Sequence, residues 1–467
     1  MVARSKRATF VCRLVLKNVK SFAGEQVLEL TDGHGNPARW TLLLGDNGVG
    51  KTTLLECLAH LSPRSNSHDL VGAQDPRLFV EPLIAAAENA VIYSLGRVDA
   101  NDCEARATYA SDALLDRDAG TETVETWISF KMIEGRPEDI VSSRWPAKEE
   151  EAVPESQWEE FSKIREPLVM AYSAGRHMGL GNLNLDNLRE GTSSLLNADT
   201  ELFDAEEMIL HLDYASLKPR AATAKHQKQL LLETLAALLP EVRRAANIVI
   251  YGPSALGERR KKGVYVRTPD GEVPLRQLSF GYQTMMAWIC DLAWRLFVHN
   301  PRSNHPLNEP AIVIVDEIDL HLHPSWQRQI RSLLTRHFPN VQFIATAHSP
   351  LIAQAFLDAN LAVVMRDGNH SMIENDPVAV ATWRLDQIVT SDLFDLASPW
   401  PPEVDALFEE QARLLADPKR TPEQRVRLAE IEAKMLELPT EENPADETAL
   451  SIIRSAARDL RARDRAR

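Results

Sequence analysis

The stretch from Gly45 to Thr52 reads GDNGVGKT and matches the pattern GxxxxGK[ST] at every fixed position. Glycines at this spacing let backbone N–H groups converge on phosphate oxygens, at a point where the following helix also favours an anion. Lys51 is expected to reach the β- and γ-phosphates, and the Thr52 hydroxyl to hold Mg²⁺. A chance glycine-rich turn is the alternative. The residues that we expect to contact the nucleotide are Gly45, Asn47, Gly48, Gly50, Lys51, Thr52 and Thr53.

Two carboxylates, Asp316 and Glu317, follow the unbroken apolar run Ala311–Val315. Such a run is typical of a strand that is buried on both faces of a parallel sheet, and ligands bind at the carboxyl ends of these strands. We expect Asp316 to position the Mg²⁺ and its water shell, and Glu317 to orient and polarise the attacking water. The structural alternative is that Asp316 only caps the next helix.

A third motif, Ser279-Phe280-Gly281, opens an expected helix before the acidic strand. Serine is common at this position for purely local reasons, so the motif alone is weak. A serine hydroxyl and a helix N-terminus also form an anion clamp. Because the first clamp of the same subunit is already filled, we expect Ser279 and Gly281 to grip the γ-phosphate held by another subunit.

Three histidines lie near the acidic residues. His348 follows the expected strand Val341–Thr346, which places it beside Asp316 and Glu317, where a neutral imidazole could sense the γ-phosphate. A structural histidine is the alternative. His321 and His323 form a His-x-His pair that could indicate a transition-metal site. No third ligand is evident, so a loop that contacts another subunit is the preferred interpretation.

A parallel sheet must bring these motifs together, and the hydrophobic patterns beside the motifs predict its strands and helices. Thr41–Leu44 predicts a strand before the glycine-rich loop and Leu54–Leu61 a helix after it. Alternation over residues 10–30 predicts a hairpin. Residues 134–167 hold four prolines and the acidic cluster Glu149–Glu151, which favours a surface segment with little sheet. Further helices are expected at Gly281–Val298, Ser325–His337, Leu351–Ala359, Pro402–Leu415, Pro422–Leu436 and Ala445–Arg463.

Composition limits the class of protein. The chain has 467 residues, of which 44% are hydrophobic and 25% charged, the mix of a folded protein. A net charge of −15 argues against a general nucleic-acid coat, although a local basic patch at Arg259–Lys262 could meet phosphates. Cys12, Cys57, Cys103 and Cys290 form no CxxC pair, which suits a reducing cytosol. No membrane-spanning run is present, so we expect a cytoplasmic protein.

In this order the four motifs resemble those of the ATP-binding-cassette ATPases, with Ser279–Gly281 as the signature and His348 as the switch histidine. The start Asn18–Phe22 and the stretches GDNGVGKTT, LSFGYQ, DEIDLHLHP and TAHSP resemble the standalone RecF/SMC-like ATPases of bacteria. That group includes relatives of the overcoming-lysogenisation-defect nucleases and the ATPase subunits of Septu-type and PARIS-type anti-phage systems. The stretch Ala171–Arg176 is similar to a Tyr-x-x-x-Arg segment of the same group.

The resemblance implies an α/β fold, a P-loop NTPase with an ABC-type ATPase head, an inserted α/β region and a C-terminal helical extension. The first part of the head is expected over residues 1–61 and the insert over residues 62–245. The second part, with the signature, acidic strand, D-loop and switch histidine, is expected over residues 246–370. Residues 371–467 would form the helical extension.

The resemblance also implies ATP and Mg²⁺ as cofactors, held between two heads of a head-to-tail dimer. Glu317, His348 and Lys51 would be catalytic, and Asp319 would contact the partner's phosphate-binding loop. Phe280 replaces the glycine that is usual in transporter signatures, which argues against a transporter subunit. Gln74 is a candidate for the magnesium-contacting glutamine of the fold.

The nuclease relatives carry a Toprim domain, but residues 357–467 offer no separated Glu and Asp-x-Asp, so no intrinsic nuclease is expected. The prediction is an ATPase that forms at least a dimer and controls a separate effector, such as an HNH or Toprim nuclease, in anti-phage defence. Two alternatives stay open. One is a nucleotide-locked scaffold with little hydrolysis, and the other is a repair or recombination ATPase that acts directly on DNA.

Overall fold

A computed structural model of the chain divides into two compact units, Met1–Asp395 and Leu396–Arg467. The structure describes residues 8–64, 81–82, 95, 97, 100–111, 123–133, 136–144, 167–179, 191–197, 200–239, 242, 244–252, 262–269, 271–356, 359–375, 388, 398, 400–417 and 420–435.

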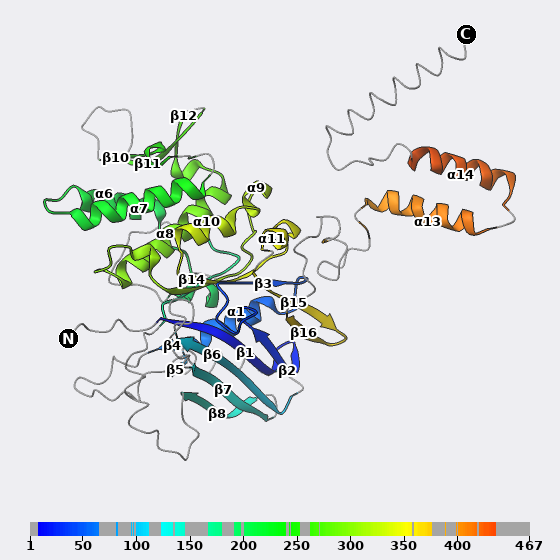
Figure 1. Ribbon diagram of the computed structural model, residues 1–467, viewed down its shortest axis with the longest axis horizontal. Coiled ribbons are helices and arrows are strands. Elements are labelled where there is room, and N and C mark those ends of the chain that lie inside the picture. Colours follow the sequence, from blue (N-terminus) through cyan, green and yellow to red (C-terminus); the bar gives the residue numbers. More distant parts are fainter. Residues whose placement is uncertain are drawn as a thin grey trace, which may run out of the picture. The chain divides into compact units, whose positions relative to one another are not determined.

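One large sheet organises the first unit, with the strand order β8-β7-β6-β1-β2-β16-β15-β3-β14-β13-β9 (Figure 1). Its strands are β1 (Thr9–Val19), β2 (Phe22–Glu29), β3 (Trp40–Leu44), β6 (Asp102–Ser111), β7 (Thr123–Ile133), β8 (Arg136–Arg144), β9 (Val169–Tyr172), β13 (Ala311–Val315), β14 (Val341–Thr346), β15 (Asn360–Asp367) and β16 (His370–Asn375). The strands expected at Thr41–Leu44, Ala311–Val315 and Val341–Thr346 and the hairpin are therefore present, whereas the sequence patterns did not indicate β6, β8, β15 and β16.

The four strands that carry the motifs are all parallel. In the register, Leu43 of β3 pairs with Thr346 of β14, and Ala345 of β14 pairs with Val315 of β13. Val315 in turn pairs with Tyr172 of β9. The carboxyl ends of β3, β14, β13 and β9 therefore meet at one edge of the sheet, which is where α/β folds bind ligands.

β8 corrects the expectation of little sheet between residues 134 and 167, because Arg136–Arg144 pairs antiparallel with β7. The strand lies at the end of the sheet order. An edge strand accepts proline because one side of it needs no ladder hydrogen bonds, so Pro137 does not prevent pairing. Proline content alone was a poor guide to this segment.

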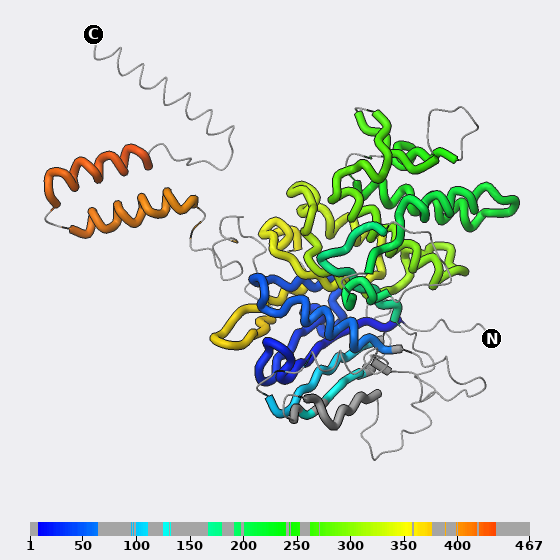
Figure 2. Tube along the Cα trace, turned by 180° about the vertical axis from the view of Figure 1, so that it is seen from behind, coloured from blue at the N-terminus to red at the C-terminus, as the bar shows by residue number. Residues whose placement is uncertain are grey.

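Helices cover the sheet on both sides (Figures 1 and 2). α1 (Lys51–His60) covers one face, where its side chains share a core with residues of β1 and β6. The opposite face is covered by α6 (Ala205–Ser216), α7 (Ala222–Leu238), α8 (Phe280–His299) and α10 (Ile330–His337). The strands between them alternate their side chains, as in β3, where Trp40, Leu42 and Leu44 enter one core and Leu43 the other. Burial on both faces explains the unbroken apolar runs.

Short elements complete the first unit. The expected helix Ser325–His337 is divided into α9 (Pro324–Gln327) and α10. The other elements are α5 (Ser193–Leu196), α11 (Pro350–Ala355), the two-stranded sheet of β4 (Pro63–Arg64) and β5 (Glu81–Pro82), the three-stranded sheet of β10 (Ile248–Tyr251), β11 (Gly263–Thr268) and β12 (Gly271–Pro274), and the 3₁₀ turns η3 (Ala245–Asn247), η4 (Leu275–Gln277) and η5 (Pro306–Asn308).

The sheet crosses the expected domain limits. Strands β6 to β9 come from the segment expected as an insert, and β16 lies beyond residue 370 but pairs with β2 and β15. Each added strand supplies ladder partners to a neighbour that would otherwise be an open edge. The domain limits themselves stay predictions.

The second unit contains α13 (Pro402–Ala416) and α14 (Pro422–Met435), which begin at the expected prolines. Leu428 and Ile431 are buried, and Arg427 pairs with Glu410 at 2.8 Å. The helix expected at Ala445–Arg463 lies outside the described residues. In the part of the chain that the structure describes, no helix is long and apolar enough to cross a membrane, and all four cysteines are free and buried.

Candidate active site

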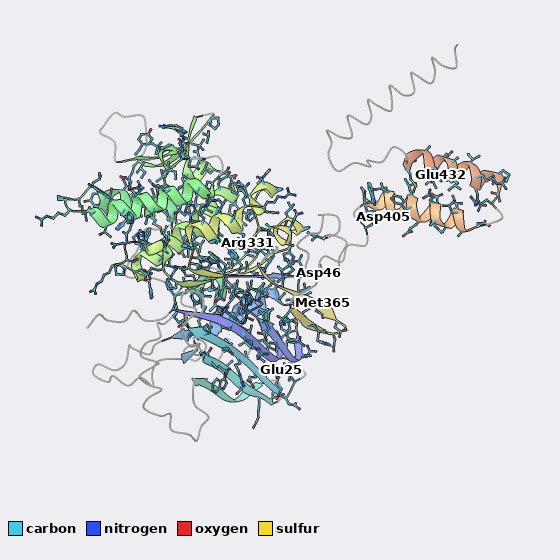
Figure 3. All side chains as sticks on the ribbon, in the orientation of Figure 1. Glu25, Asp46, Arg331, Met365, Asp405 and Glu432 are labelled. Carbon is cyan, nitrogen blue, oxygen red and sulfur yellow. The ribbon has the colours of Figure 1, made fainter. Side chains whose placement is uncertain are left out.

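The phosphate-binding loop connects β3 to α1 and needs glycine at two places. Gly45 and Gly50 have φ angles of 138° and 105°, a region that side chains disfavour. A Cβ on Gly45 would lie 2.1 Å from the carbonyl oxygen of Val364, and one on Gly50 would lie 2.7 Å from Ser21 Oγ. Figure 3 labels Asp46 in this loop and Met365 in β15, the strand that pairs with β3. Close approach of β15 and the β1–β2 hairpin therefore fixes the loop's shape.

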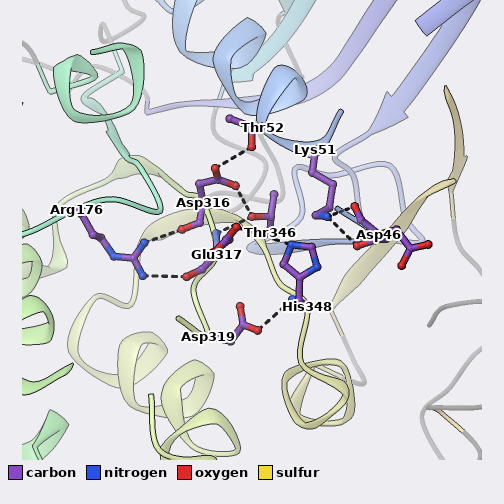
Figure 4. Close-up of polar contacts among 10 residues, drawn as sticks. Asp46, Lys51, Thr52, Arg176, Asp316, Glu317, Asp319, Thr346 and His348 are labelled. Carbon is purple, nitrogen blue, oxygen red and sulfur yellow. Dashed lines mark hydrogen bonds and ion pairs between the residues drawn. The ribbon is translucent and has the colours of Figure 1, made fainter. Parts of the chain in front are cut away.

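Lys51 lies under this loop with only 6% of its surface exposed. Its ammonium donates to the carbonyl oxygens of Gly45 and Asp46, both at 2.7 Å (Figure 4). Burial lowers the pKa of Lys51, and the carboxylates of Asp316 and Glu317 oppose that shift. The cation is thus held inside the loop. Of the other expected nucleotide contacts, Asn47, Gly48 and Thr52 are exposed, and Thr53 is buried.

The Thr52 hydroxyl and the Asp316 carboxylate meet at the first turn of α1. Thr52 Oγ1 donates to Asp316 Oδ2 at 2.9 Å, and Thr346 Oγ1 donates to Asp316 Oδ1 at 2.6 Å. A hydroxyl and a carboxylate are hard oxygen donors of the kind that Mg²⁺ prefers, together with substrate phosphates. The donor set on these two residues fits a magnesium ion bound with a triphosphate.

Glu317 has an unusual backbone, with φ at 47°. Such a conformation costs about 1–3 kcal/mol for a residue with a side chain and persists only where neighbours hold it. Its N–H donates to Thr346 Oγ1 at 2.7 Å. Its carboxylate Oε1 lies 3.9 Å from His348 Nε2, and both side chains are about one-third exposed. The expected acid–histidine pair is therefore brought together at the sheet edge.

Asp319 connects the loop after β13 to His348. Its Oδ2 accepts a hydrogen bond from the main-chain N–H of His348 at 3.1 Å. Its Oδ1 is buried and has no hydrogen-bond partner in the described part of the chain. Gln327 steadies the same region, because its side-chain NH₂ contacts the Asp319 carbonyl at 3.4 Å and its Oε1 accepts from Ser349 Oγ at 2.6 Å. These contacts tie the loop after β13 to the segment that carries His348.

The signature lies against this loop as well. A Cβ on Gly281 would lie 2.4 Å from the carbonyl oxygen of His321, and the Phe280 ring meets the His321 ring edge-on at 4.8 Å. Ser279 begins α8, but its hydroxyl makes no hydrogen bond to that helix, and its side chain is exposed. Phe280 is 54% exposed. Ser279 thus differs from a serine that serves only as a helix cap.

The His-x-His pair has a local explanation. His323 caps α9, because its Nδ1 accepts from the Ser325 N–H at 3.3 Å. Within the described ranges, no group of three or more His, Cys, Asp or Glu side chains could hold a metal ion. Gln74 and residues 259–261 of the basic turn lie outside the described residues.

Two residues that the sequence reasoning gave no role also belong to this site. Thr346 bridges Asp316 and Glu317, as described above. Arg176, 3% exposed, donates to the carbonyl oxygens of Asp316 at 2.6 Å, Glu317 at 3.0 Å and Ser173 at 2.9 Å. The available signals were the Tyr-x-x-x-Arg stretch and the threonine before Ala-His-Ser-Pro, but neither indicates a main-chain contact.

Comparisons with known proteins identify a matching family model and several relatives. Residues 41–353 match a family model described as "AAA domain, putative AbiEii toxin, Type IV TA system", and residues 13–61 match one described as "AAA domain". The chain is 40% identical over 127 residues to the Retron Ec83 probable ATPase of Escherichia coli, covering 27% of this chain and 22% of that protein. It is 43% identical over 93 residues to the Retron Vc95 probable ATPase of Vibrio cholerae, covering 20% and 18%.

A third relative is the Septu protein PtuA of Bacillus mycoides, 30% identical over 179 residues, covering 37% of this chain and 24% of that protein. The chain thus matches between 18% and 24% of the length of these relatives. The SMC head domain from Thermotoga maritima aligns with 79% of this chain and 100% of its own at 13% identity and a TM-score of 0.39.

The fold is a mixed α/β P-loop ATPase fold, with the loop, acidic strand and histidine at one sheet edge. The first family model spans more than half of the chain, and the retron and Septu proteins are similar over part of it. The chain therefore belongs to the family described as "AAA domain, putative AbiEii toxin, Type IV TA system", and it is related to retron ATPases and to Septu PtuA.

Proposed function

We propose that this protein is a magnesium-dependent ATPase whose ATP sites form between two copies arranged head to tail, and that it controls a separate effector in anti-phage defence. The observation that carries the ATPase part is the position of Glu317. Its carboxylate lies 3.9 Å from His348, on the residue next to Asp316, which accepts from Thr52. The proposed base, γ-phosphate sensor and metal site therefore lie at one edge of the sheet, where the neighbouring strands β13 and β14 end.

Each side chain has one task in the proposed reaction. Lys51 binds the β- and γ-phosphates, and Thr52 and Asp316 hold the magnesium ion, which neutralises phosphate charge when bound. Glu317 orients the attacking water and accepts its proton. His348 donates a hydrogen bond to the γ-phosphate, and its link to Asp319 couples that contact to the neighbouring loop. We propose Lys51, Glu317 and His348 as the catalytic residues.

The dimer part of the proposal is supported by Ser279 and Asp319. Ser279 presents an exposed hydroxyl that its own helix does not use. Asp319 is partly exposed, and its Oδ1, which has no hydrogen-bond partner among the described residues, must turn outward to reach another copy. In the proposed dimer, Ser279 and Gly281 contact the γ-phosphate held by the other copy, and Asp319 contacts the other copy's phosphate-binding loop.

Control of an effector is supported by the relatives and by the absence of a nuclease pattern in residues 357–467. The matched proteins carry the names of retron ATPases and of Septu PtuA. We propose a separate nuclease, of HNH or Toprim type, as the effector. Direct action on DNA is the competing function. It predicts salt-sensitive DNA binding that weakens when Arg259–Lys262 are neutralised, and no DNA binding at low salt would dismiss it.

Steady-state turnover of the Glu317→Gln variant tests the ATPase part. We expect a loss of about 100-fold or more in kcat, because general acid–base groups contribute 10²–10⁴-fold, whereas ATP affinity persists. Glu409→Gln, an exposed change on α13, is the matched control and should leave kcat unchanged. Wild-type turnover in Glu317→Gln would remove Glu317 from its role. Negligible turnover by the wild type, with an ATP-dependent oligomer, would favour the scaffold alternative.

Mass measurement of the Glu317→Gln variant with ATP and Mg²⁺ tests the dimer. We expect a mass that doubles with ATP and stays single when Ser279→Arg is added, because a bulky cation would block the contact with the partner's site. ATP binding by the single copy should survive that addition. A dimer that forms equally well with Ser279→Arg would contradict the head-to-tail arrangement.

A further inference from the structure

Arg176 binds main-chain carbonyl oxygens, whereas an arginine in a structural salt bridge binds a carboxylate side chain. It follows β9, and its guanidinium donates to three main-chain carbonyl oxygens, those of Ser173, Asp316 and Glu317. Its Nε is buried and has no hydrogen-bond partner in the described part of the chain. The planar group thus bridges the end of β9 to the end of β13, where the carboxylates of the site begin (Figure 4).

Two of the carbonyl oxygens that Arg176 binds belong to Asp316 and Glu317, and Glu317 has a positive φ angle. The Glu317 residue has φ at 47°, so it needs to be held by its surroundings. Its N–H is held by Thr346 Oγ1 at 2.7 Å, and its carbonyl oxygen by Arg176 at 3.0 Å. Because its main chain is held on both sides, the direction of the Glu317 Cα–Cβ bond is fixed too, and with it the point from which the carboxylate extends. Arg176 provides one of these two restraints.

The charge of Arg176 also suits this position. Burial lowers its pKa to about 10, while the carboxylates of Asp316, Asp319 and Glu317 oppose the shift. The group therefore stays protonated at neutral pH, behind three carboxylates that converge on the site. A lysine would keep the charge, but it lacks the rigid planar set of donors that reaches three carbonyl oxygens at once.

We propose that Arg176 is a positioning residue for ATP hydrolysis, which sets the Glu317 carboxylate for the attacking water through the main chain and makes no contact with the nucleotide. This inference rests on the proposed ATPase function. It predicts that loss of Arg176 lowers kcat and spares nucleotide affinity. A residue that only stabilised the fold would lower thermal stability without changing the turnover of the folded fraction.

The test measures kcat, KM, ATP affinity and thermal unfolding of Arg176→Met and Arg176→Lys in the full chain. We expect kcat to fall about 100-fold in Arg176→Met, the loss associated with a displacement of about 1 Å, with the Kd for ATP changed by less than about threefold. Arg176→Lys should lose about tenfold, because it restores the charge and only some of the hydrogen bonds. If Arg176→Met does not fold, the lysine variant carries the test.

The matched control is Arg295→Lys, which alters another arginine that is mostly buried, with 13% of its side chain exposed, and that pairs with Asp291 at 2.7 Å on α8. It should lower the unfolding temperature and leave kcat unchanged. A double-mutant cycle provides the decisive readout: in a Glu317→Gln background, Arg176→Met should change kcat by less than about threefold, because it acts through Glu317.

Additive losses in that cycle, unchanged kcat in Arg176→Met, or a fall in ATP affinity parallel to kcat would each overturn the inference. Failure of the proposed function looks different. If wild-type turnover is no higher than that of Glu317→Gln, the ATPase proposal falls and this inference falls with it. If the wild type hydrolyses ATP and the Arg176 variants match it, only this inference falls.

Discussion

The Thr346 hydroxyl joins Asp316 to Glu317, so removing it should lower both the stability of the fold and the turnover of ATP. It donates to Asp316 Oδ1 at 2.6 Å and accepts from the Glu317 N–H at 2.7 Å, and the side chain is fully buried. The substitution Thr346→Val replaces this hydroxyl by a methyl group of similar size and keeps a residue that suits β14. The packing volume is therefore nearly unchanged.

The magnitude follows from what is left unpaired. A buried N–H without an acceptor costs about 1–3 kcal/mol, and a hydrogen bond to a charged group is worth about 1.5–3 kcal/mol. Asp316 keeps its contact with Thr52, so we expect a net loss of about 3 kcal/mol. At about 2 °C per kcal/mol for a large domain, the unfolding temperature should fall by about 6 °C. Glu317 also loses a restraint, so kcat should fall about tenfold or more.

Thermal unfolding and ATP turnover of Thr346→Val are compared with those of Thr284→Val. Thr284 is 4% exposed, and its Oγ1 has no hydrogen-bond partner within the described ranges, so removing that hydroxyl leaves nothing unpaired. The control should melt within about 1 °C of the wild type. If Thr346→Val melts and turns over ATP like Thr284→Val, the hydroxyl does not anchor the site and the reasoning is refuted.

Two further predictions concern other parts of the first unit. Gly281→Ala places a Cβ 2.4 Å from the His321 carbonyl oxygen, so we expect ATP-dependent dimerisation, measured by light scattering, to weaken about tenfold or more while ATP affinity holds. Burial lowers the pKa of His60 to about 4, so its neutral form stabilises the fold. This contribution is complete above the free pKa of about 6.5 and is lost as pH falls toward 4, so at pH 5 the wild type should lose about 2 kcal/mol more stability than His60→Leu.

Matched comparisons decide both predictions. Gly252→Ala meets no atom within 4 Å and should dimerise like the wild type. Equal dimerisation of Gly281→Ala would show that the signature tolerates a side chain against the loop after β13. For His60, unfolding by denaturant is measured at pH 7 and pH 5. Parallel losses in the wild type and in His60→Leu would mean that other groups carry the acid sensitivity.

The motifs of the candidate site could be recognised because each is a run of consecutive residues. Local spacing alone predicts the phosphate-binding loop from Gly45 to Thr52 and the apolar strand Ala311–Val315. Both lie where the patterns predicted. The prediction of little sheet over residues 134–167 was wrong for β8. An edge strand accepts Pro137 because no strand pairs with it on one side, and this depends on the order of the strands in the sheet. No residue in the segment itself carries that information.

The sequence by itself determined the phosphate-binding loop, the acidic strand end and the histidine after the next strand, and these predict the class of chemistry, since the signals lie in side-chain type and short spacing. Only the tertiary structure decided that Thr346 joins Asp316 to Glu317 and that Arg176 holds their carbonyl oxygens. Those contacts depend on the register between β9, β13 and β14, which is set by packing across the whole sheet. A main-chain carbonyl is present at every residue, so nothing in the sequence marks the few that a distant arginine will bind.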